Sequence, residues 1–258
     1  MDYILGKSRL KGRLQARLPA PLCYTLLLMA HFEFLRRLGL FTVAEFLTPE
    51  ECAHLRGLAA VSEGAQATVY RDRERQLDEE ARRTLEVRLM DPVQLEVERR
   101  MHGLSPAFER HFGLELDGSD RLHWLVYGPG DFFRLHSDVA SAGKVDPSGP
   151  YRELALRAVS VVVFLNHPNQ SEEPYQGGDL TFYGLMKTPG GKEYGFPVDA
   201  ETGLLVAFPS DTVHEVTPVT GGKRYTLVTW FFAREPKEAG NSSNADHRDV
   251  KTEIQGNS

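Results

Sequence analysis

The sequence predicts an α+β fold in which a closed or sandwiched antiparallel sheet follows a set of flanking helices. Three observations predict it. After Leu122 the chain breaks into short runs rich in Val, Phe, Tyr, Trp and Thr, which Gly and Pro separate. Helix start signals occur only before that point. Seven short strands with no helical pattern between them favour a jelly roll or a barrel with the helices packed outside it.

The helix signals come first along the chain. Thr48-Pro-Glu-Glu51 supplies an N-cap, a proline at the first helical position and acids in the first turn, which predicts a helix to about Ala60. Asp91-Pro92 opens a second helix, and Pro106 opens a short third one. Residues 71–89 are densely charged and only partly periodic, which is typical of a solvated face.

The strand signals follow. Each candidate strand is rich in apolar, β-branched or aromatic residues and is bounded by turn residues. The predicted strands are 122–127, 132–136, 158–165, 179–183, 204–208, 213–216 and 225–232. By composition the chain divides into a basic and apolar extension, a helical support region, a jelly-roll core and a disordered polar tail. These four parts are residues 1–29, 30–121, 122–233 and 234–258.

The charge balance excludes one class of partner. Among 258 residues, 30 Lys and Arg stand against 36 Asp and Glu, so the formal net charge is −6. This argues against nucleic acid and against an anionic membrane surface as partners. Two cysteines, Cys23 and Cys52, are too few for a disulfide framework, which favours the cytoplasm.

The N-terminal extension suggests an alternative cellular location for the protein, which is export. Basic residues from Lys7 to Arg17 precede an apolar run at 18–30, as in a signal peptide. The run is too short to span a bilayer, and two prolines interrupt it. We therefore expect a cytoplasmic protein, with export as the minor alternative and Met29 as an alternative start.

Histidines carry the candidate chemistry. His136-Ser-Asp138 places an imidazole and a carboxylate on one face of a strand, because residues i and i+2 of a strand share a face. The pattern alone is weak, since His247-Arg-Asp249 repeats it in the polar tail. Its setting is more informative, because a strand, a turn and a second strand lead from Tyr127 to these residues. His214 likewise follows an apolar strand and a turn.

Two histidines and one aspartate can form a facial triad. Such a set occupies one face of an octahedral ion and is typical of non-haem Fe(II) oxygenases. Arg224 follows His214 by ten residues, immediately before the last predicted strand.

This pattern resembles the Fe(II)- and 2-oxoglutarate-dependent dioxygenase superfamily, close to its prolyl 4-hydroxylase-like branch. The segments that carry the resemblance are 127–138, 157–166, 177–180 and 203–230. The resemblance implies a double-stranded β-helix, or jelly-roll, core. It implies that 2-oxoglutarate is decarboxylated to succinate and CO2 while O2 hydroxylates a C–H bond of a substrate. That substrate is a peptidyl prolyl residue, another side chain or a small metabolite. Ascorbate is implied only as an auxiliary reagent that keeps the iron reduced.

The resemblance also assigns roles to residues. It implies that His136, Asp138 and His214 bind Fe(II). It implies that Arg224 pairs with the distal carboxylate of 2-oxoglutarate, which a planar guanidinium meets with two parallel hydrogen bonds.

Further residues of this site follow from the resemblance. Thr226 shares a strand face with Arg224 and is expected to add a hydroxyl to the same carboxylate, and Tyr127 is expected to add its phenol. Phe164 is a departure, because some family members hold the co-substrate with a tyrosine from this strand.

Several neighbouring residues receive simpler expectations. We expect packing or surface roles for His123, His167 and Trp230, and a turn or close backbone approach at Gly177 and Gly178. The long segment 139–153 is a candidate substrate lid, and the loops 166–177 and 184–201 are candidates for specificity.

Two other classes of function fit part of the pattern. One is a binding or sensing protein that keeps the jelly roll and a metal without turnover. The other is a metal-dependent isomerase or cupin-like enzyme that uses no keto acid. Arg224 distinguishes them from the oxygenase, because a dicarboxylate co-substrate needs a cation beyond the metal. Oligomeric state and substrate identity are not readable from the sequence.

Overall fold

The structure is a computed structural model of the chain. The residues that it describes are 30–71, 74–88, 92–140, 145, 149–169, 172–186 and 194–234. The predicted extension at 1–29 lies outside these ranges, as does the predicted tail beyond Arg234. No helix within them is both long and apolar enough to cross a membrane.

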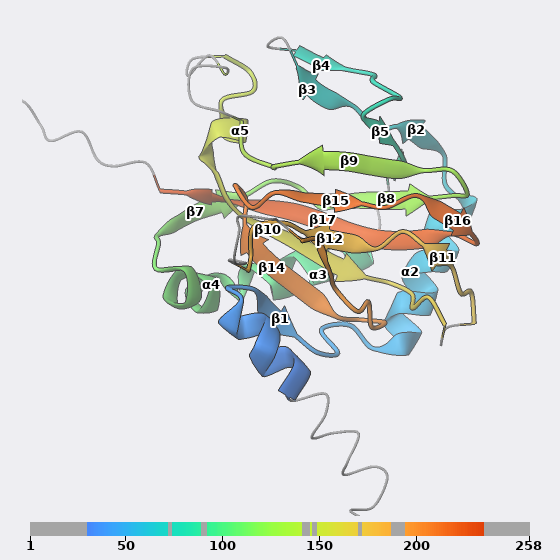
Figure 1. The fold of residues 1–258 in the computed structure, drawn as a ribbon, viewed down its shortest axis with the longest axis horizontal. Coiled ribbons are helices and arrows are strands. Elements are labelled where there is room, and N and C mark those ends of the chain that lie inside the picture. The colour runs from blue at the N-terminus through green and yellow to red at the C-terminus, as the bar shows by residue number, and fades with distance from the viewer. Residues whose placement is uncertain are drawn as a thin grey trace, which may run out of the picture.

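An eight-stranded antiparallel sheet forms the larger layer of the described fold (Figure 1). Its long central strands are β10 (Arg157–Phe164) and β17 (Arg224–Ala233), which pair with each other. Beyond β10 lie β14 (Leu205–Pro209) and β1 (Phe41–Val43). The strands beyond β17 are β8 (His123–Tyr127), β6 (Leu85–Val87) and β2 (Gly64–Gln66), and β7 (Leu116–Ser119) also pairs with β17.

A smaller antiparallel sheet of five strands forms the second layer. Its strands in order are β13 (Phe196–Pro197), β12 (Leu180–Phe182), β15 (His214–Val216), β9 (Phe132–His136) and β5 (Arg82–Arg83). Two short strand pairs complete the described sheets: β3 (Val69–Arg71) with β4 (Glu74–Gln76), and β11 (Gln176–Gly177) with β16 (Val219–Gly221). The β3–β4 hairpin lies above β9 at the top of Figure 1.

Helices pack on the outer face of the larger sheet. They are α2 (Pro49–Val61), α3 (Pro92–His102) and α4 (Ser105–Phe112). A helix at residues 30–37 precedes them and instead packs against the cluster between the sheets through Leu35. The predicted cap of α2 is present as a capping box, in which the Thr48 hydroxyl accepts from the Glu51 amide at 3.2 Å. Apolar residues of these three labelled helices share one buried cluster with the larger sheet.

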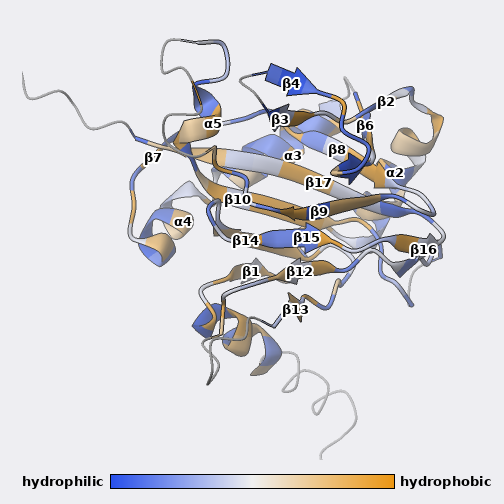
Figure 2. Cartoon of the chain, turned by 45° about the horizontal axis from the view of Figure 1, so that its top comes forward, coloured by the Kyte–Doolittle hydropathy of each residue, from blue (hydrophilic) through white to orange (hydrophobic). Residues whose placement is uncertain are grey.

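The strand period of two divides the core into two layers. Val161 and Val163 of β10 join the cluster beneath the helices, whereas Val162 and Phe164 join a second cluster between the two sheets. Because β10 is buried on both faces, its sequence is almost uninterrupted in apolar residues. Figure 2 shows this apolar centre, and it shows that β4 is hydrophilic.

The predicted fold class is confirmed, and so are its elements. All seven predicted strands are present with ends that differ by at most one residue, and the three predicted helices are present. The interpretation of 71–89 as only a solvated face was incomplete, because this charged stretch forms short strands from β3 to β6. The region 30–121 therefore contains strands as well as helices. A four-residue helix, α5 (Glu153–Leu156), lies beyond Leu122, where no helix was expected.

Gly203 joins the start of α2 to the larger sheet. Its φ angle is +80°, and a Cβ there would lie 2.0 Å from the Leu47 carbonyl oxygen. Its amide donates to the Phe164 carbonyl at 2.8 Å, and its own carbonyl accepts from the Leu47 amide at 3.3 Å. Only glycine fits here, both for its backbone angle and for the space.

We expect Gly203→Ala to destabilise the protein by about 3 kcal/mol, because the added methyl meets backbone that cannot move cheaply. Gly39→Ala is the matched control, since Gly39 has φ +88° but nothing within 4 Å of an added Cβ. That change should cost only about 1 kcal/mol for the left-handed backbone angle. Urea unfolding of both variants tests the prediction, and equal losses would contradict it.

Candidate metal centre

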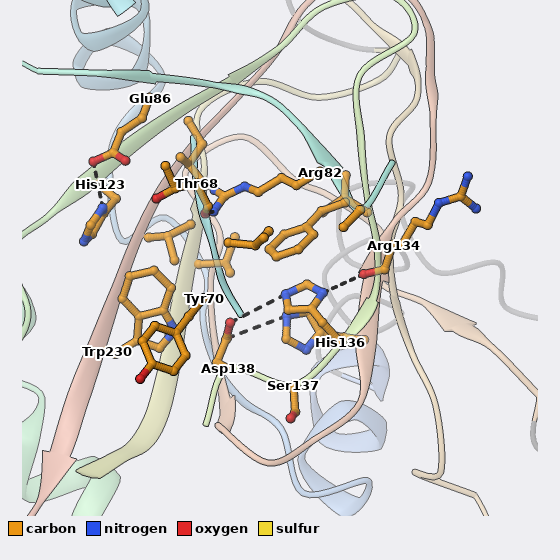
Figure 3. Close-up of a pocket in the computed structure, with 18 of the residues that line it drawn as sticks. Thr68, Tyr70, Arg82, Glu86, His123, Arg134, His136, Ser137, Asp138 and Trp230 are labelled. Atoms are coloured by element: carbon orange, nitrogen blue, oxygen red, sulfur yellow. Dashed lines mark hydrogen bonds and ion pairs between the residues drawn. The ribbon is translucent and has the colours of Figure 1, made fainter. Parts of the chain in front are cut away.

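Three possible metal ligands meet in a pocket between the two sheets (Figure 3). His136 ends β9, and His214 begins β15 directly opposite it in register. Asp138 follows β9, and its backbone amide donates to the Ser210 carbonyl at 2.8 Å. One ligand atom from each of the three side chains lies within 4.8 Å of the other two. The pairing of β9 with β15 therefore brings together residues that are far apart in the sequence.

Each imidazole is oriented by a carbonyl two residues before it. The Nδ1 atom of His136 lies 2.7 Å from the Arg134 carbonyl oxygen, and that of His214 lies 2.9 Å from the Thr212 carbonyl oxygen. A carbonyl can only accept, so Nδ1 carries the proton and Nε2 keeps its lone pair. Each Nε2 lies 3.6 Å from a different oxygen of Asp138. The three side chains therefore turn their donor atoms toward one point.

The Asp138 carboxylate is held by one buried hydroxyl, which a second buried hydroxyl contacts in turn. Ser160 on β10 donates to Asp138 Oδ2 at 2.7 Å, and the hydroxyls of Ser160 and Ser210 lie 2.9 Å apart. Both serines are buried. Sequence reasoning missed them, because a serine within an apolar strand carries no signal of its partner.

The protonation states suit metal binding. Burial and the neighbouring His136 lower the pKa of His214 to about 4. Burial alone would raise the pKa of Asp138, but the facing imidazoles of His214 and His136 outweigh it and lower that pKa below its ordinary range. At neutral pH the pocket therefore presents a neutral His214 and an ionised Asp138, the forms that bind a cation.

Arg224 is a buried cation that lines the same cavity. Its side chain is 1% exposed, and no carboxylate of the described residues forms an ion pair with it. One guanidinium nitrogen lies 3.4 Å from the Thr226 hydroxyl, and Nε has no hydrogen-bond partner. The rings of Tyr127 and Phe164 lie 5.1 and 5.3 Å from its guanidinium carbon. A buried charge without a counter-ion is costly, which indicates a place for an anionic ligand.

The backbone on both sides of Arg224 is fixed by Asn166. The Asn166 amide nitrogen donates to the Lys223 carbonyl at 2.8 Å, and its oxygen accepts from the Tyr225 amide at 3.0 Å. Alternation along β17 then points Arg224 and Thr226 into the cavity.

The two predicted glycines serve close approaches, as expected. Gly177 and Gly178 have φ angles of +67° and +69°. A Cβ on Gly177 would lie 2.3 Å from the Pro218 carbonyl oxygen. A Cβ on Gly178 would lie 3.0 Å from Cδ of Arg224, so glycine lets this backbone pass beside the buried cation.

The aromatic residues around Arg224 include one that the sequence did not reveal. Tyr127 lies directly opposite Arg224 in register, and Phe164 lies opposite Thr226. Tyr175 also interacts with Arg224; burial raises the pKa of the Tyr175 phenol, while the Arg224 charge opposes that rise. Phe164 offers no hydroxyl, so Tyr175 brings a phenol to the same guanidinium from a different segment.

The three residues for which we expected packing or surface roles, His123, His167 and Trp230, divide into two groups. His167 is buried and accepts from the Asn169 amide at 2.9 Å, in keeping with a packing role. His123 and Trp230 are buried too, but both line the cavity. The guanidinium carbon of Arg157 lies 3.5 Å from the centre of the Trp230 ring.

The cavity encloses about 700 Å³, and residues of the β3–β4 hairpin contribute to its lining. No described residue of the loops 166–177 and 184–201 is among the residues that line it, but Tyr175 of the first loop reaches Arg224, and the role of these loops in specificity stays a prediction. Residues of 68–82 line it instead. In the predicted lid at 139–153, Val139 and Ala140 line the cavity, while 141–144 and 146–148 lie outside the described residues.

We expect Ser160→Ala to weaken binding of Mn(II) to the apoprotein by about tenfold, because the Asp138 carboxylate loses its orienting donor. Thr84→Val is the matched control, since the buried Thr84 hydroxyl donates to the Val126 carbonyl at 3.0 Å and does not line the cavity. Titration calorimetry measures both. Equal affinities for Ser160→Ala and the parent protein would refute the orienting role.

Comparison with known proteins gives consistent matches. The profile of the 2OG-Fe(II) oxygenase superfamily matches residues 122–232. A PKHD-type hydroxylase of Azoarcus sp. strain BH72 is 32% identical over 201 residues, covering 72% of this chain and 74% of the relative. A PKHD-type hydroxylase of Paracoccus denitrificans is 31% identical, covering 74% of this chain and 77% of the relative. The crystal structure of a Pseudomonas putida prolyl-4-hydroxylase matches with a TM-score of 0.56 at 25% identity, over 81% of this chain and 100% of that one.

Proposed function

The chain belongs to the 2OG-Fe(II) oxygenase superfamily and is an Fe(II)- and 2-oxoglutarate-dependent hydroxylase with a jelly-roll core, and we propose that the pocket between its sheets is the active site. In this proposal His136, Asp138 and His214 hold the iron. Arg224 anchors the distal carboxylate of 2-oxoglutarate, with Thr226 and Tyr127 beside it.

One observation carries this assignment. Arg224 is buried in the cavity that also contains the three candidate ligands, and no described carboxylate neutralises it. A metal site that binds no dicarboxylate would gain nothing from such a cation and would bear its desolvation cost. 2-Oxoglutarate supplies both a chelating end for the metal and a second carboxylate for the guanidinium.

The donor set fits Fe(II). Two imidazoles and one carboxylate are the ligands of non-haem Fe(II) oxygenases, and both Nε2 atoms here keep their lone pairs. When bound, Fe(II) supplies the O2 chemistry that couples decarboxylation of 2-oxoglutarate, to succinate and CO2, with hydroxylation of a C–H bond.

The protein's own side chains position the reactants and exclude water. The Arg224 guanidinium offers two parallel donors to a carboxylate, which fixes the direction of the co-substrate as well as its charge. Thr226 and Tyr175 add hydroxyls near that end. Apolar side chains such as Leu125, Val162 and Leu180 line the cavity, so the charges inside it act with little screening by solvent.

For the molecule that is hydroxylated, we propose a class of substrate rather than a single compound. The solved structure from Pseudomonas putida is named a prolyl-4-hydroxylase, which supports a peptidyl prolyl residue as the first candidate. Another side chain and a small metabolite remain the alternatives. We further propose ascorbate as an auxiliary reductant and the cytoplasm as the compartment.

Release of succinate from 2-oxoglutarate tests the function. The protein with Fe(II) and O2 should release succinate, slowly without substrate and faster with it. His136→Ala should abolish release, because one of three ligands is lost. A protein that binds Fe(II) and 2-oxoglutarate yet never turns over would instead be the binding or sensing protein.

We expect Arg224→Met to weaken 2-oxoglutarate binding by about a hundredfold, since a buried charge pair of this kind contributes a few kcal/mol. Binding is measured with Mn(II) in place of Fe(II), so that no reaction occurs. The same variant should keep its Mn(II) affinity, and its melting temperature without ligand should be unchanged or higher, because the lost cation has no described counter-ion. Unaltered 2-oxoglutarate affinity would exclude Arg224 as the anchor.

A further inference from the structure

The lining of the cavity is rich in cations although the chain as a whole is acidic. The lining arginines other than Arg224 are Arg71, Arg75, Arg82, Arg134 and Arg157. The lining carboxylates are Glu86, which is paired with His123 and Arg121, and Asp138, which belongs to the candidate metal centre. With a net charge of −6 over the chain, this concentration of arginine is local to the cavity.

Some of these arginines are already engaged. Arg71 pairs with Asp78 at 2.5 Å, and Arg157 pairs with Asp120 at 3.0 Å. The Arg134 guanidinium points away from the candidate metal centre in Figure 3, and its Nε donates to the Glu80 carbonyl. The remaining two, Arg75 and Arg82, form no ion pair with any carboxylate in the described part of the chain.

Arg82 lies next to the candidate metal centre. Its guanidinium carbon lies 4.6 Å from the centre of the Phe133 ring, and that ring stacks on His136 with centroids 3.5 Å apart. Arg82 also donates to the Thr68 carbonyl at 3.2 Å, while its buried Nε has no partner. The cation is therefore held in a defined place, one aromatic ring away from a proposed iron ligand.

Arg75 approaches from the hairpin above. It lies opposite Tyr70 in the β3–β4 pair, and its guanidinium carbon lies 5.7 Å from the centre of the Tyr151 ring. Tyr70 and Tyr151 contact each other edge to face at 5.5 Å. Arg75 lines the same cavity as Arg82, and two cations without a described ion pair that face one cavity favour anionic groups there.

We propose, resting on the function proposed above, that the hydroxylated residue belongs to an acidic polypeptide segment whose carboxylates bind Arg75 and Arg82. A polypeptide fits because apolar and aromatic side chains line the cavity together with the cations: among them are Leu135, which is 57% exposed, and Tyr70. A nucleic acid fits less well, since the chain carries a net charge of −6 and a phosphate backbone is bound by many cations.

Three pools of short peptides test this proposal. All have the same randomised, uncharged centre that includes proline, with flanks of Asp and Glu, of Asn and Gln, or of Lys and Arg. Each pool is measured for stimulated succinate release with Fe(II). Each is also measured for direct binding to the protein loaded with Mn(II) and 2-oxoglutarate, and a single-stranded DNA oligonucleotide is measured alongside.

We expect the acidic pool to bind and to stimulate most. Arg75→Gln should raise its apparent KM by about fivefold, the effect of losing one partly exposed charge pair. The affinity of 2-oxoglutarate should not change. Arg75→Glu should shift the preference toward the basic pool. Arg83→Gln is the control, because Arg83 neighbours Arg82 on β5 but is exposed and does not line the cavity.

The results that overturn the proposal are distinct from failure of the proposed function. Equal binding of the acidic and neutral pools, preference for the oligonucleotide, or equal effects of Arg75→Gln and Arg83→Gln would overturn it, as would no binding of the acidic pool. In each of these cases 2-oxoglutarate still binds and releases succinate. If 2-oxoglutarate itself neither binds nor turns over, the proposed function fails instead.

Discussion

The uncompensated charge of Arg224 is the constraint on which the rest of this site depends. Burying a guanidinium beside aromatic rings costs free energy, and no carboxylate of the described residues forms an ion pair that would offset this cost. The chain nevertheless fixes that cation from several sides, through Asn166 on its backbone and Gly178 beside its side chain. Such an arrangement makes physical sense if the counter-ion arrives with the co-substrate. The protein's stability without ligand is then sacrificed in part for selectivity toward a dicarboxylate.

The sandwich of two sheets explains how this cation and the candidate metal ligands come to face one cavity. Alternation along β17 sends Arg224, Thr226, Val228 and Trp230 toward the smaller sheet, while Tyr225, Leu227 and Phe231 pack under the helices. The smaller sheet places His214 opposite His136 in register. One sheet therefore contributes the proposed co-substrate anchor and the other the proposed metal ligands, so the spacing of the sheets sets the distance between the two ends of the site.

Much of this could be predicted from the sequence, because strands with period-two patterns and turn residues have strong local signals. The predicted candidate residues His136, Asp138, His214 and Arg224 do converge on one cavity. What the sequence could not reveal depends on partners that are distant in the chain. Ser160 looks like any small strand residue until its contact with Asp138 is seen, and Tyr175 gives no sign that it reaches Arg224. The charged strands β3 to β6 escaped prediction because they are two or three residues long and mostly exposed, so they show no apolar alternation.

The central claim is that one small dicarboxylate bridges the candidate metal centre and Arg224. A crystal structure of the protein with Mn(II) and 2-oxoglutarate, grown without O2, tests it most directly, with the metal located by its anomalous scattering. The account predicts Mn(II) bound by His136, Asp138 and His214, and the distal carboxylate of 2-oxoglutarate on the Arg224 guanidinium. A metal bound elsewhere, or a 2-oxoglutarate molecule whose distal carboxylate does not contact Arg224, would contradict it.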